Sequence, residues 1–330
     1  MPPTPTPPTV FVTGGAGYVG SHCCKAFAAA GWRVVVFDNL SRGWRDLVRW
    51  GPLIEGDLLD PAALRKALDE TRPDVVAHFA AVAYVGESVE QPDLYYRNNV
   101  VGTLNLLEAM RRSGVLRLVF SSSCATYGAP VRLPVDETHP QSPISPYGWS
   151  KLMAEKMLAD FDAAFGLRHV ALRYFNAAGA DLDGEIGERH EPETHMVPLA
   201  IQAALAGGRA FTVNGVDFDT ADGSAVRDYV HVNDLADAHC RALAYLMSGG
   251  ASEAMNLGVG RGLSVLEILA AVEAVSGRPV PRAVGPRRPG DPAAVFADAG
   301  KAARILGWTP VHSDVATIVE TAWRWHGAHA

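Results

Sequence analysis

Short apolar runs alternate with longer stretches of helical periodicity through the first half of the chain. The apolar runs are bounded by turn residues, so we expect them to form buried strands. They occupy residues 10–12, 33–37, 53–55, 75–79, 116–120 and 169–173. The stretches expected to be helical run through residue 30 and over residues 61–70, 93–113 and 147–165. Strands that alternate with helices predict a parallel sheet covered by helices on both faces, the doubly wound α/β fold.

The pattern changes after Asn176. Glycine, proline, aspartate and histidine become frequent as far as His195, and helical and loop stretches then alternate to the end. An apolar run at residues 229–232 precedes another helical stretch, which we expect to return to the first part of the chain. We therefore expect one domain over residues 10–175 with a returning segment near 226–250, and a smaller C-terminal substrate-binding lobe over most of residues 176–330.

Composition narrows the class of protein. The chain has 330 residues, of which 48% are hydrophobic and 20% charged, as in an ordinary globular protein. The net charge of −7 and the lack of a long cationic run argue against a nucleic-acid partner. No apolar run is long enough to span a membrane, so we expect no membrane partner. Cys23 and Cys24 are adjacent and lack metal-ligand spacing, which fits reduced thiols in a cytoplasmic protein. The first nine residues, MPPTPTPPT, are rich in proline, and we expect a disordered extension rather than a signal peptide.

Three glycines follow the first predicted strand. Gly14, Gly17 and Gly20 lie between that strand and a helix, where glycines permit a tight turn and let backbone N–H groups approach a pyrophosphate. Asp38 ends the second strand, where a carboxylate binds the 2′-hydroxyl of an adenosine ribose and repels a 2′-phosphate. The pattern predicts a Rossmann-like domain that binds NAD rather than NADP, although a structural turn with a helix-capping aspartate would leave the same residues.

Tyr147 and Lys151 are four residues apart in a predicted helix. Positions four apart share a helix face, so the lysine ammonium can lie beside the phenol and lower its pKa. A phenol that exchanges protons near neutral pH is a general acid and base. The spacing alone also fits a buried tyrosine with a surface lysine one turn later. The Rossmann-like context favours the catalytic interpretation.

Several polar or small residues follow the ends of predicted strands. In doubly wound sheets, ligands bind at the carboxyl ends of the strands, so these positions are expected to converge on one crevice. They are Asp38, Asp57, Ala80, Ser123 and Asn176.

Longer motifs extend this picture over nearly the whole chain. They are TGGAGYVGSH from Thr13, DNLSRG from Asp38, EGDLLD from Glu55, HFAAVAYVGES from His78, YYRNNVVGT from Tyr95, FSSSCATYG from Phe120, SPYGWSKLMAE from Ser145, LRYFNAAGA from Leu172, VRDYVHVNDLADAH from Val226, NLGVGRGLSV from Asn256 and PRRPGD from Pro286. With these motifs the chain resembles the extended short-chain dehydrogenase/reductases, and among them the UDP-glucose 4-epimerases.

The resemblance implies a role for each matching residue. NAD would be held by Gly14, Gly17, Tyr18, Val19, Asp38, Asn39, Asp57, Leu58, Phe79, Ala80, Asn98, Tyr147 and Lys151. Ser123, Tyr147 and Lys151 would form the catalytic set. The UDP-sugar would contact Ser123, Asn176, Met196, Arg227, Arg288, Asp291 and Val295, and no metal is expected. The two arginines also fit ordinary ion pairs with Asp228 and Asp291.

The implied reaction interconverts UDP-glucose and UDP-galactose. Tyr147 would take the proton of the 4-hydroxyl while the C4 hydride moves to NAD. The 4-keto sugar would then turn over in the pocket, and the hydride would return to its opposite face. Because net redox is zero, NAD should stay bound and act as a true catalyst. A homodimer is also implied by the resemblance.

Two departures from the family pattern leave alternatives open. Ala83 stands where well-known bacterial members have a lysine near the cofactor, and Val295 replaces a bulky tyrosine that closes the sugar pocket in some relatives. The alternatives are 4-epimerisation of UDP-N-acetylglucosamine or of UDP-xylose and UDP-arabinose, a sugar-nucleotide dehydratase, or a catalytically silent NAD-binding module. A dehydratase is disfavoured because Cys124 and Ala125 follow Ser123, where dehydratases carry acidic residues.

Two other features receive structural interpretations. Residues 188–195, ERHEPETH, contain metal-ligating residue types, but Pro192 prevents a regular helix and the spacing is irregular. We expect a loop over the substrate there. Trp149 lies on a different helix face from Tyr147, and we expect it to pack in the core.

Overall fold

The computed structural model describes residues 6–206, 210–288 and 291–329. Residues 1–5 of the predicted disordered extension lie outside the described residues, as do Pro289 and Gly290 of the PRRPGD motif. The chain divides into two compact units. Unit 1 comprises Met1–Ser122, Ser145–Leu172 and Ala236–Ala254, and unit 2 comprises Ser123–Ile144, Arg173–Leu235 and Met255–Ala330.

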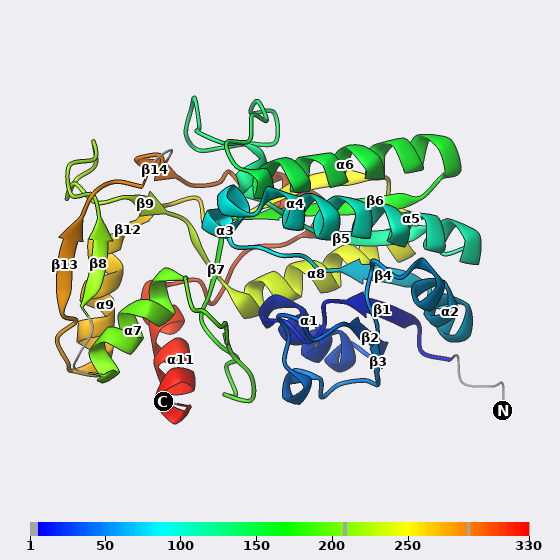
Figure 1. Cartoon of the computed structure of the whole chain (residues 1–330), viewed down its shortest axis with the longest axis horizontal. Coiled ribbons are helices and arrows are strands. Elements are labelled where there is room, and N and C mark those ends of the chain that lie inside the picture. Colours follow the sequence, from blue (N-terminus) through cyan, green and yellow to red (C-terminus); the bar gives the residue numbers. More distant parts are fainter. Residues whose placement is uncertain (1–5, 207–209, 289–290, 330) are drawn as a thin grey trace. The chain divides into compact units, whose positions relative to one another are not determined.

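Unit 1 is built on a seven-stranded sheet with the strand order β11-β6-β5-β4-β1-β2-β3 (Figure 1). Its strands are β1 (Thr9–Thr13), β2 (Arg33–Asp38), β3 (Leu53–Glu55), β4 (Val75–His78), β5 (Arg117–Ser123), β6 (Arg168–Tyr174) and β11 (Glu253–Leu257), and the last three of these end within unit 2. Strand β1 pairs in parallel with both β2 and β4, and β4 with β5. The doubly wound α/β fold expected from the sequence is confirmed.

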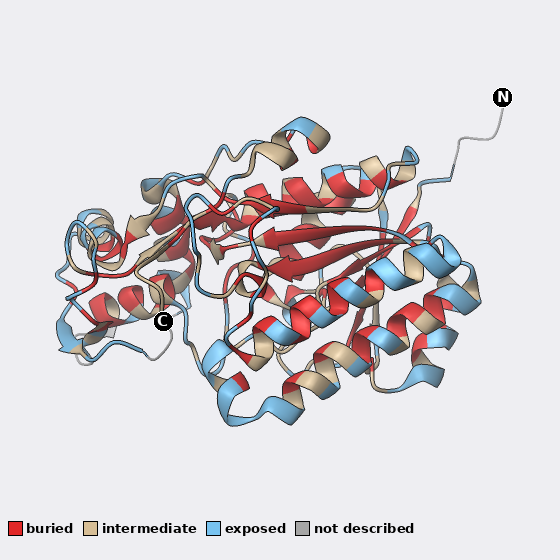
Figure 2. Cartoon of the chain, turned by 90° about the horizontal axis from the view of Figure 1, so that it is seen from above, coloured by how far each residue is buried: buried red, intermediate tan, exposed pale blue. Residues whose placement is uncertain are grey.

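The helices of unit 1 cover buried strands. Figure 2 shows the central strands buried throughout and the neighbouring helices exposed on one side. The helices are α1 (Tyr18–Ala29), η1 (Arg45–Leu47), α2 (Pro61–Thr71), α3 (Val85–Glu90), α4 (Pro92–Tyr95), η2 (Tyr96–Val101), α5 (Gly102–Ser113), α6 (Pro146–Phe165) and α8 (Val232–Met247), the last of which begins in unit 2.

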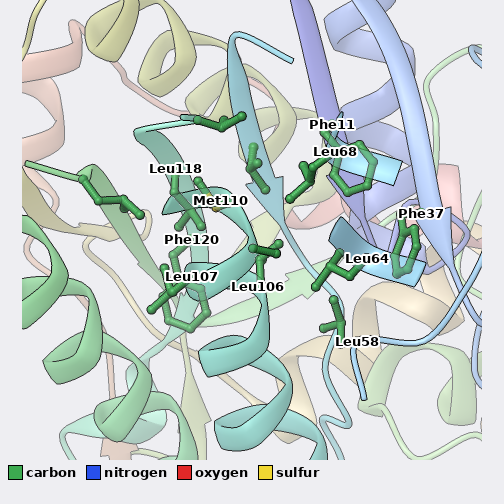
Figure 3. Packing of buried hydrophobic residues seen from close by; sticks show 14 of the residues in the cluster. Phe11, Phe37, Leu58, Leu64, Leu68, Leu106, Leu107, Met110, Leu118 and Phe120 are labelled. Carbon is green, nitrogen blue, oxygen red and sulfur yellow. The ribbon is translucent and has the colours of Figure 1, made fainter. Parts of the chain in front are cut away.

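One hydrophobic cluster joins the sheet to α2, α5 and α6 (Figure 3). Phe11 and Phe120 come from the strands, Leu64 from α2 and Leu107 from α5, and all of them are buried. Burial of such large side chains stabilises a fold by about 1.5–3 kcal/mol each, which is why the apolar runs are a reliable guide to the sheet.

Local signals set the ends of these helices. The side chain of Asp60 accepts hydrogen bonds from the N–H groups of Ala62 and Ala63, and Pro61 occupies the first turn of α2. Helix α5 ends at Gly114, whose left-handed backbone has a φ of 73°. The single helix expected over residues 93–113 contains a π-helical turn, η2, and π turns are often found near functional sites.

Unit 2 contains three small sheets. In these sheets β7 pairs with β10, β9 lies between β12 and β14, and β8 pairs with β13. The strands are β7 (Asn176–Ala178), β8 (Phe211–Asn214), β9 (Val226–Arg227), β10 (Tyr229–His231), β12 (Leu263–Ser264), β13 (Arg282–Gly285) and β14 (Ala294–Val295). The helices are η3 (Cys124–Thr126), α7 (Met196–Ala206), α9 (Val265–Ser276), α10 (Gly300–Leu306) and α11 (Val315–Ala328), and residues of α7, α9 and α11 share a second apolar core.

No described helix meets the length and hydropathy needed to cross a membrane.

Candidate active site

The turn between β1 and α1 requires glycine. Gly14 has a φ of +76°, and a Cβ there would lie 2.4 Å from the backbone nitrogen of Ala80. A Cβ on Gly20 would lie 2.2 Å from the carbonyl oxygen of Gly14. Ala80 itself is held by its N–H, which donates to Thr13 O at 3.1 Å. Gly20 therefore allows the first turn of α1 to pack on the backbone of Gly14, and Gly14 allows the residues after β4 to pack on the same turn.

The N-terminus of α1 carries the partial positive charge of the helix without a side chain to neutralise it. Gly17 is the N-cap and makes no side-chain capping bond, and the first turn has no acidic residue. Tyr18 opens the helix with a nearly buried ring that packs edge-on against His22. A helix start of this kind suits the pyrophosphate of a dinucleotide.

Asp38 ends β2 as a buried and rigidly held carboxylate. Its Oδ2 accepts the N–H of Ala16 at 3.0 Å and its Oδ1 accepts the N–H of Leu40 at 2.8 Å. Burial raises the pKa of Asp38, while these two hydrogen bonds act in the opposite direction. Two backbone donors leave lone pairs on both oxygens, so the carboxylate can still accept hydrogen bonds from ribose hydroxyls.

The residues expected to flank the adenosine are linked to one another. The side-chain amide of Asn39 donates to Asp57 Oδ2 at 2.9 Å, and Asp57 Oδ1 accepts the N–H of Leu59. Leu58 is 8% exposed and belongs to the core cluster of unit 1. Its side chain therefore offers only an edge to a ligand.

Phe79 and Asn98 have local partners. The N–H of Phe79 donates to Thr13 O at 2.9 Å, and its ring packs against His239 with centroids 4.8 Å apart. Asn98 lies in the π turn and donates to Leu94 O within its own helix. Its neighbour Asn99 is buried and donates to both Val82 O and Ser150 Oγ.

Lys151 is buried beside Tyr147 in α6. The lysine is 4% exposed, and its Nζ lies 5.9 Å from the centre of the Tyr147 ring. It donates to Ser121 O at 2.8 Å and lies 5.0 Å from the Phe120 ring centre. Burial lowers the pKa of Lys151 to about 8 despite the opposing effect of Glu155. The helix that carries both residues is capped by Ser145, whose hydroxyl accepts the N–H of Gly148.

Ser123 is the last residue of β5, two residues after the carbonyl that binds Lys151. It is 7% exposed, and its hydroxyl oxygen accepts the N–H of Ala125 at 3.1 Å. This contact uses the hydroxyl oxygen as an acceptor. A serine hydroxyl can also donate its proton to a substrate oxygen.

Three of the residues expected to contact the UDP-sugar, Asn176, Arg227 and Val295, lie in small strands of unit 2. Val295 in β14 is paired in register with Arg227 in β9, and Asn176 in β7 is paired with Tyr229 in β10. Arg227 Nη2 lies 2.7 Å from Asp291 Oδ1. The ion pair anticipated for this arginine is therefore present, with Asp291 as the partner.

Asp228 has a different role from ion pairing with Arg227. It is fully buried and its carboxylate accepts the N–H groups of Val259, Gly260 and Ala297. Burial raises the pKa of Asp228 to about 6. Its main-chain carbonyl accepts the side-chain amide of Asn176 at 3.0 Å, so Asp228 orients that candidate UDP-binding residue.

The remaining expected residues differ in exposure. Val295 is 8% exposed and packs in a small buried cluster with Tyr127, Val135, Phe175 and Ala297. Met196 is the first residue of α7 and is partly buried, and Arg288 is exposed. Trp149 was expected in the core, but its side chain is 42% exposed, because it lies on the outer face of α6.

Comparison with known proteins places this geometry in a family. The model of the NAD dependent epimerase/dehydratase family matches residues 10–258. The chain belongs to this family. A UDP-glucose 4-epimerase of Rhizobium leguminosarum bv. trifolii is 54% identical over 318 residues, which cover 96% of this chain and 97% of the relative.

Solved structures agree with the epimerase/dehydratase assignment. The UDP-glucose 4-epimerase from Brucella ovis in complex with NAD matches with a TM-score of 0.94 at 53% identity, covering 96% of this chain and 97% of that one. The UDP-glucose-4-epimerase from Stenotrophomonas maltophila, solved with bound NAD and formylated UDP-arabinopyranose, matches with a TM-score of 0.94 at 40% identity, covering 97% and 98%.

The residues of unit 1 fit the cofactor of the epimerase/dehydratase family. The turn at Gly14 leaves no room for a Cβ, the helix behind it is uncapped, and the Asp38 carboxylate is fixed by two backbone donors. A dinucleotide without a 2′-phosphate matches these three features. The turn would let the pyrophosphate approach the backbone, the helix start would favour its negative charge, and the carboxylate would accept hydrogen bonds from the ribose.

Sequence reasoning missed one buried charge in this epimerase/dehydratase site. Glu155 follows Lys151 by one helical turn, is 8% exposed and accepts the hydroxyl of Ser122 at 2.5 Å. The signal was present, since residues 147, 151 and 155 share one face of α6. A lysine one turn from a glutamate is common on exposed faces, so only its burial distinguishes this pair.

Proposed function

We propose that this chain is an NAD-dependent 4-epimerase that interconverts UDP-glucose and UDP-galactose. The observation that carries the proposal is the buried Lys151 beside Tyr147, in the same unit as a complete dinucleotide-binding turn. The near full-length identity to UDP-glucose 4-epimerases supports the same reaction.

The first unit would hold the cofactor. Gly14, Gly17, Tyr18 and Val19 would face its pyrophosphate. Asp38 and Asn39 would bind the adenosine ribose, with Asp57 and Leu58 beside the adenine. Phe79, Ala80 and Asn98 would line the channel, and Lys151 would bind the nicotinamide ribose. Bound NAD would supply a reversible hydride acceptor, and the sugar would pass through a 4-keto form.

The protein's own residues would move the proton. Tyr147 would accept the proton of the 4-hydroxyl and later return it, acting as base and then as acid. Lys151, held by Ser121 O, would favour the phenolate through its positive charge. Ser123 would donate a hydrogen bond to the developing alkoxide without adding charge.

The second unit would hold the nucleotide. Arg227 and Arg288 offer forked donors that match a diphosphate, and Asn176, Met196 and Asp291 would complete the contacts. Asp291 would keep Arg227 oriented before the diphosphate arrives, since the two are already paired. Firm contacts to UDP and few to the sugar would leave the sugar free to turn, as the reaction requires.

The proposal is tested with purified protein and no added NAD. We expect NAD to copurify and UDP-galactose to be converted to UDP-glucose, as followed by chromatography of a panel of UDP-hexoses, UDP-N-acetylhexosamines and UDP-pentoses. Protein that is empty as isolated and active only with exchanging NAD would contradict the proposal. If only UDP-pentoses or UDP-N-acetylhexosamines react, the chain is a 4-epimerase with a different sugar substrate.

Tyr147→Phe isolates the chemical step. We expect nearly complete loss of turnover with UDP binding retained, because the phenol acts on the sugar and not on the nucleotide. Trp149→Phe is the matched control, since this exposed ring lies in the same helix and should be dispensable. Wild-type rates in Tyr147→Phe would show that another group carries the proton.

We also propose that the enzyme is a cytoplasmic homodimer, as the family resemblance implies. Light scattering of the purified protein measures the mass in solution, and a monomer at working concentration would refute the dimer. Fractionation of the source cells measures the location.

A further inference from the structure

Four side chains converge in the loop that precedes α7. Glu188, His190, Glu193 and His195 each place one carboxylate oxygen or ring nitrogen within 4.8 Å of the others. All four belong to unit 2, and none is among the residues assigned above to NAD or UDP. Irregular spacing along the sequence argued against a metal site here, but the loop folds so that the four side chains meet.

Four separations between candidate ligand atoms are close to the edge length of a coordination tetrahedron, and the two that involve Glu193 use its two different oxygens. His190 Nδ1 lies 3.2 Å from Glu188 Oε1 and 3.7 Å from Glu193 Oε2. His195 Nδ1 lies 2.9 Å from Glu188 Oε1 and 3.2 Å from Glu193 Oε1. A zinc ion with four ligands at roughly 2.0–2.1 Å separates neighbouring ligand atoms by about 3.3 Å. The observed separations lie on either side of this value.

One oxygen of the buried Glu188 carboxylate lacks the hydrogen bond expected of it. Its side chain is 3% exposed, and its Oε1 has no hydrogen-bond partner of acceptable geometry among the described residues, although two ring nitrogens lie close to it. A buried carboxylate without hydrogen bonds is costly. The Glu188 oxygen and the two ring nitrogens are close together without forming good hydrogen bonds. A cation bound between them would use their lone pairs instead.

The loop is held in place independently of any ion. The indole of Trp325 in α11 donates to Glu188 O at 2.9 Å. Glu193 Oε1 accepts the N–H groups of Thr194 and His195, which leaves Oε2 to face His190. The main chain at Glu188 and the carboxylate of Glu193 are therefore positioned by hydrogen bonds that need no ion.

We propose that Glu188, His190, Glu193 and His195 form a binding site for a divalent transition-metal cation, with Zn²⁺ the best match. Imidazole and carboxylate ligands suit zinc, and two carboxylates balance its charge. Glu188 lies at the buried side of the cluster, and the side chain of His195 is 44% exposed. Four protein ligands leave no open position, so the ion is structural. It ties down the loop that leads directly into Met196, the first residue of α7.

A metal-free ion-pair network is the competing arrangement. Burial disfavours the charged imidazole of His195, but the carboxylates of Glu188 and Glu193 outweigh this effect and raise its pKa to about 10. Two imidazolium ions facing two carboxylates are also neutral overall. The two arrangements differ in whether a metal displaces the protons, which can be measured directly.

The test uses the full chain with any purification tag removed. The protein is dialysed against a chelator and then titrated with ZnCl₂ by calorimetry, and bound metal is counted by elemental analysis after gel filtration. We expect one zinc per chain and a rise of several degrees in melting temperature with zinc. Replacement by Co²⁺ should give the visible absorption of a tetrahedral site.

Variants separate this site from other carboxylates. Glu188→Gln and His195→Gln should each weaken zinc binding at least tenfold and abolish the zinc-dependent rise in melting temperature. Asp183→Asn is the matched control, because Asp181, Asp183 and Glu185 form a second acidic cluster in the same unit. Circular dichroism before zinc is added shows whether each variant is folded.

The outcomes decide between the two arrangements. No bound zinc in the wild type, or zinc that Glu188→Gln and His195→Gln retain, would overturn the proposal in favour of the ion-pair network. Loss of zinc in Asp183→Asn alone would move the ion to the other cluster and also overturn it. Epimerase activity does not enter these readouts, so the proposed function stands or fails separately.

Discussion

Replacing Glu155 by glutamine tests whether a buried carboxylate keeps Lys151 charged. Lys151 is buried, and burial lowers its pKa to about 8, while Glu155 acts in the opposite direction. Glu155 lies one turn further along α6 and is held by the hydroxyl of Ser122. The charge of Lys151 matters for the proposed mechanism, in which it would favour the phenolate of Tyr147.

The magnitude follows from the separation of the two charges. Opposite charges one helical turn apart, roughly 6 Å, attract by about 3 kcal/mol at an effective dielectric constant of about 20. This attraction corresponds to about two pKa units. We therefore expect Glu155→Gln to lower the pKa of Lys151 from about 8 to roughly 6.

The sign of the pH effect follows. At pH 7 about nine-tenths of the wild-type lysines carry a charge, but only about one-tenth would do so in the variant. The rate at pH 7 should therefore fall about tenfold. Activity should recover only at a more alkaline pH, where the phenol ionises without help from the lysine.

The assay is the initial rate of UDP-galactose conversion from about pH 6 to about pH 9 at saturating substrate. Ser122→Ala is the control, because it removes the hydrogen bond to Glu155 but keeps both charges, and it should retain the wild-type pH profile. A folded, NAD-loaded Glu155→Gln enzyme with an unchanged profile would refute the reasoning.

Three further predictions concern the cofactor, the fold and the sugar. Because the buried Asp38 carboxylate would repel a 2′-phosphate, we expect calorimetry of the NAD-free protein to show that NAD binds at least about tenfold more tightly than NADP. Asp38→Asn should reduce this difference in affinity. Equal affinities of the wild type for NAD and NADP would contradict the prediction. Gly14→Ala should lower the free energy of unfolding by at least about 2 kcal/mol, because its φ is positive and its Cβ would meet backbone, whereas Gly86→Ala enters open space and should melt like the wild type. We expect UDP-N-acetylglucosamine to be turned over alongside UDP-glucose, and we expect Val295→Tyr to reject it because the larger ring would take the space that the acetamido group needs. A wild-type enzyme that rejects the N-acetylated sugar would contradict this prediction.

Features encoded by neighbouring residues could be predicted from the sequence. Apolar runs predicted strands β1 to β6 to within a few residues but not β11, and Asp60 and Gly114 predicted helix ends that the structure confirms. The proximity of Tyr147 and Lys151 also follows from local geometry, because a helix places residues four apart on one face.

Burial could not be predicted in the same way. Spacing does not reveal that Lys151 is 4% exposed or that Trp149, two residues earlier, is 42% exposed. Both depend on which face of α6 meets the sheet. The pKa of the lysine depends on that burial, so its chemistry was only partly visible in the sequence.

The sequence by itself determined the alternation of strands β1 to β6 with helices, the glycine turn and the spacing of Tyr147 and Lys151, since each arises from contacts within a few residues. Only the tertiary structure decided that Arg227 pairs with Asp291, that Asp228 is bound by backbone from two distant segments, and that residues 188–195 bring four ligand atoms together. Irregular loops have no period from which side-chain directions can be calculated. Their geometry is set by the distant residues that hold them, such as Trp325 behind Glu188.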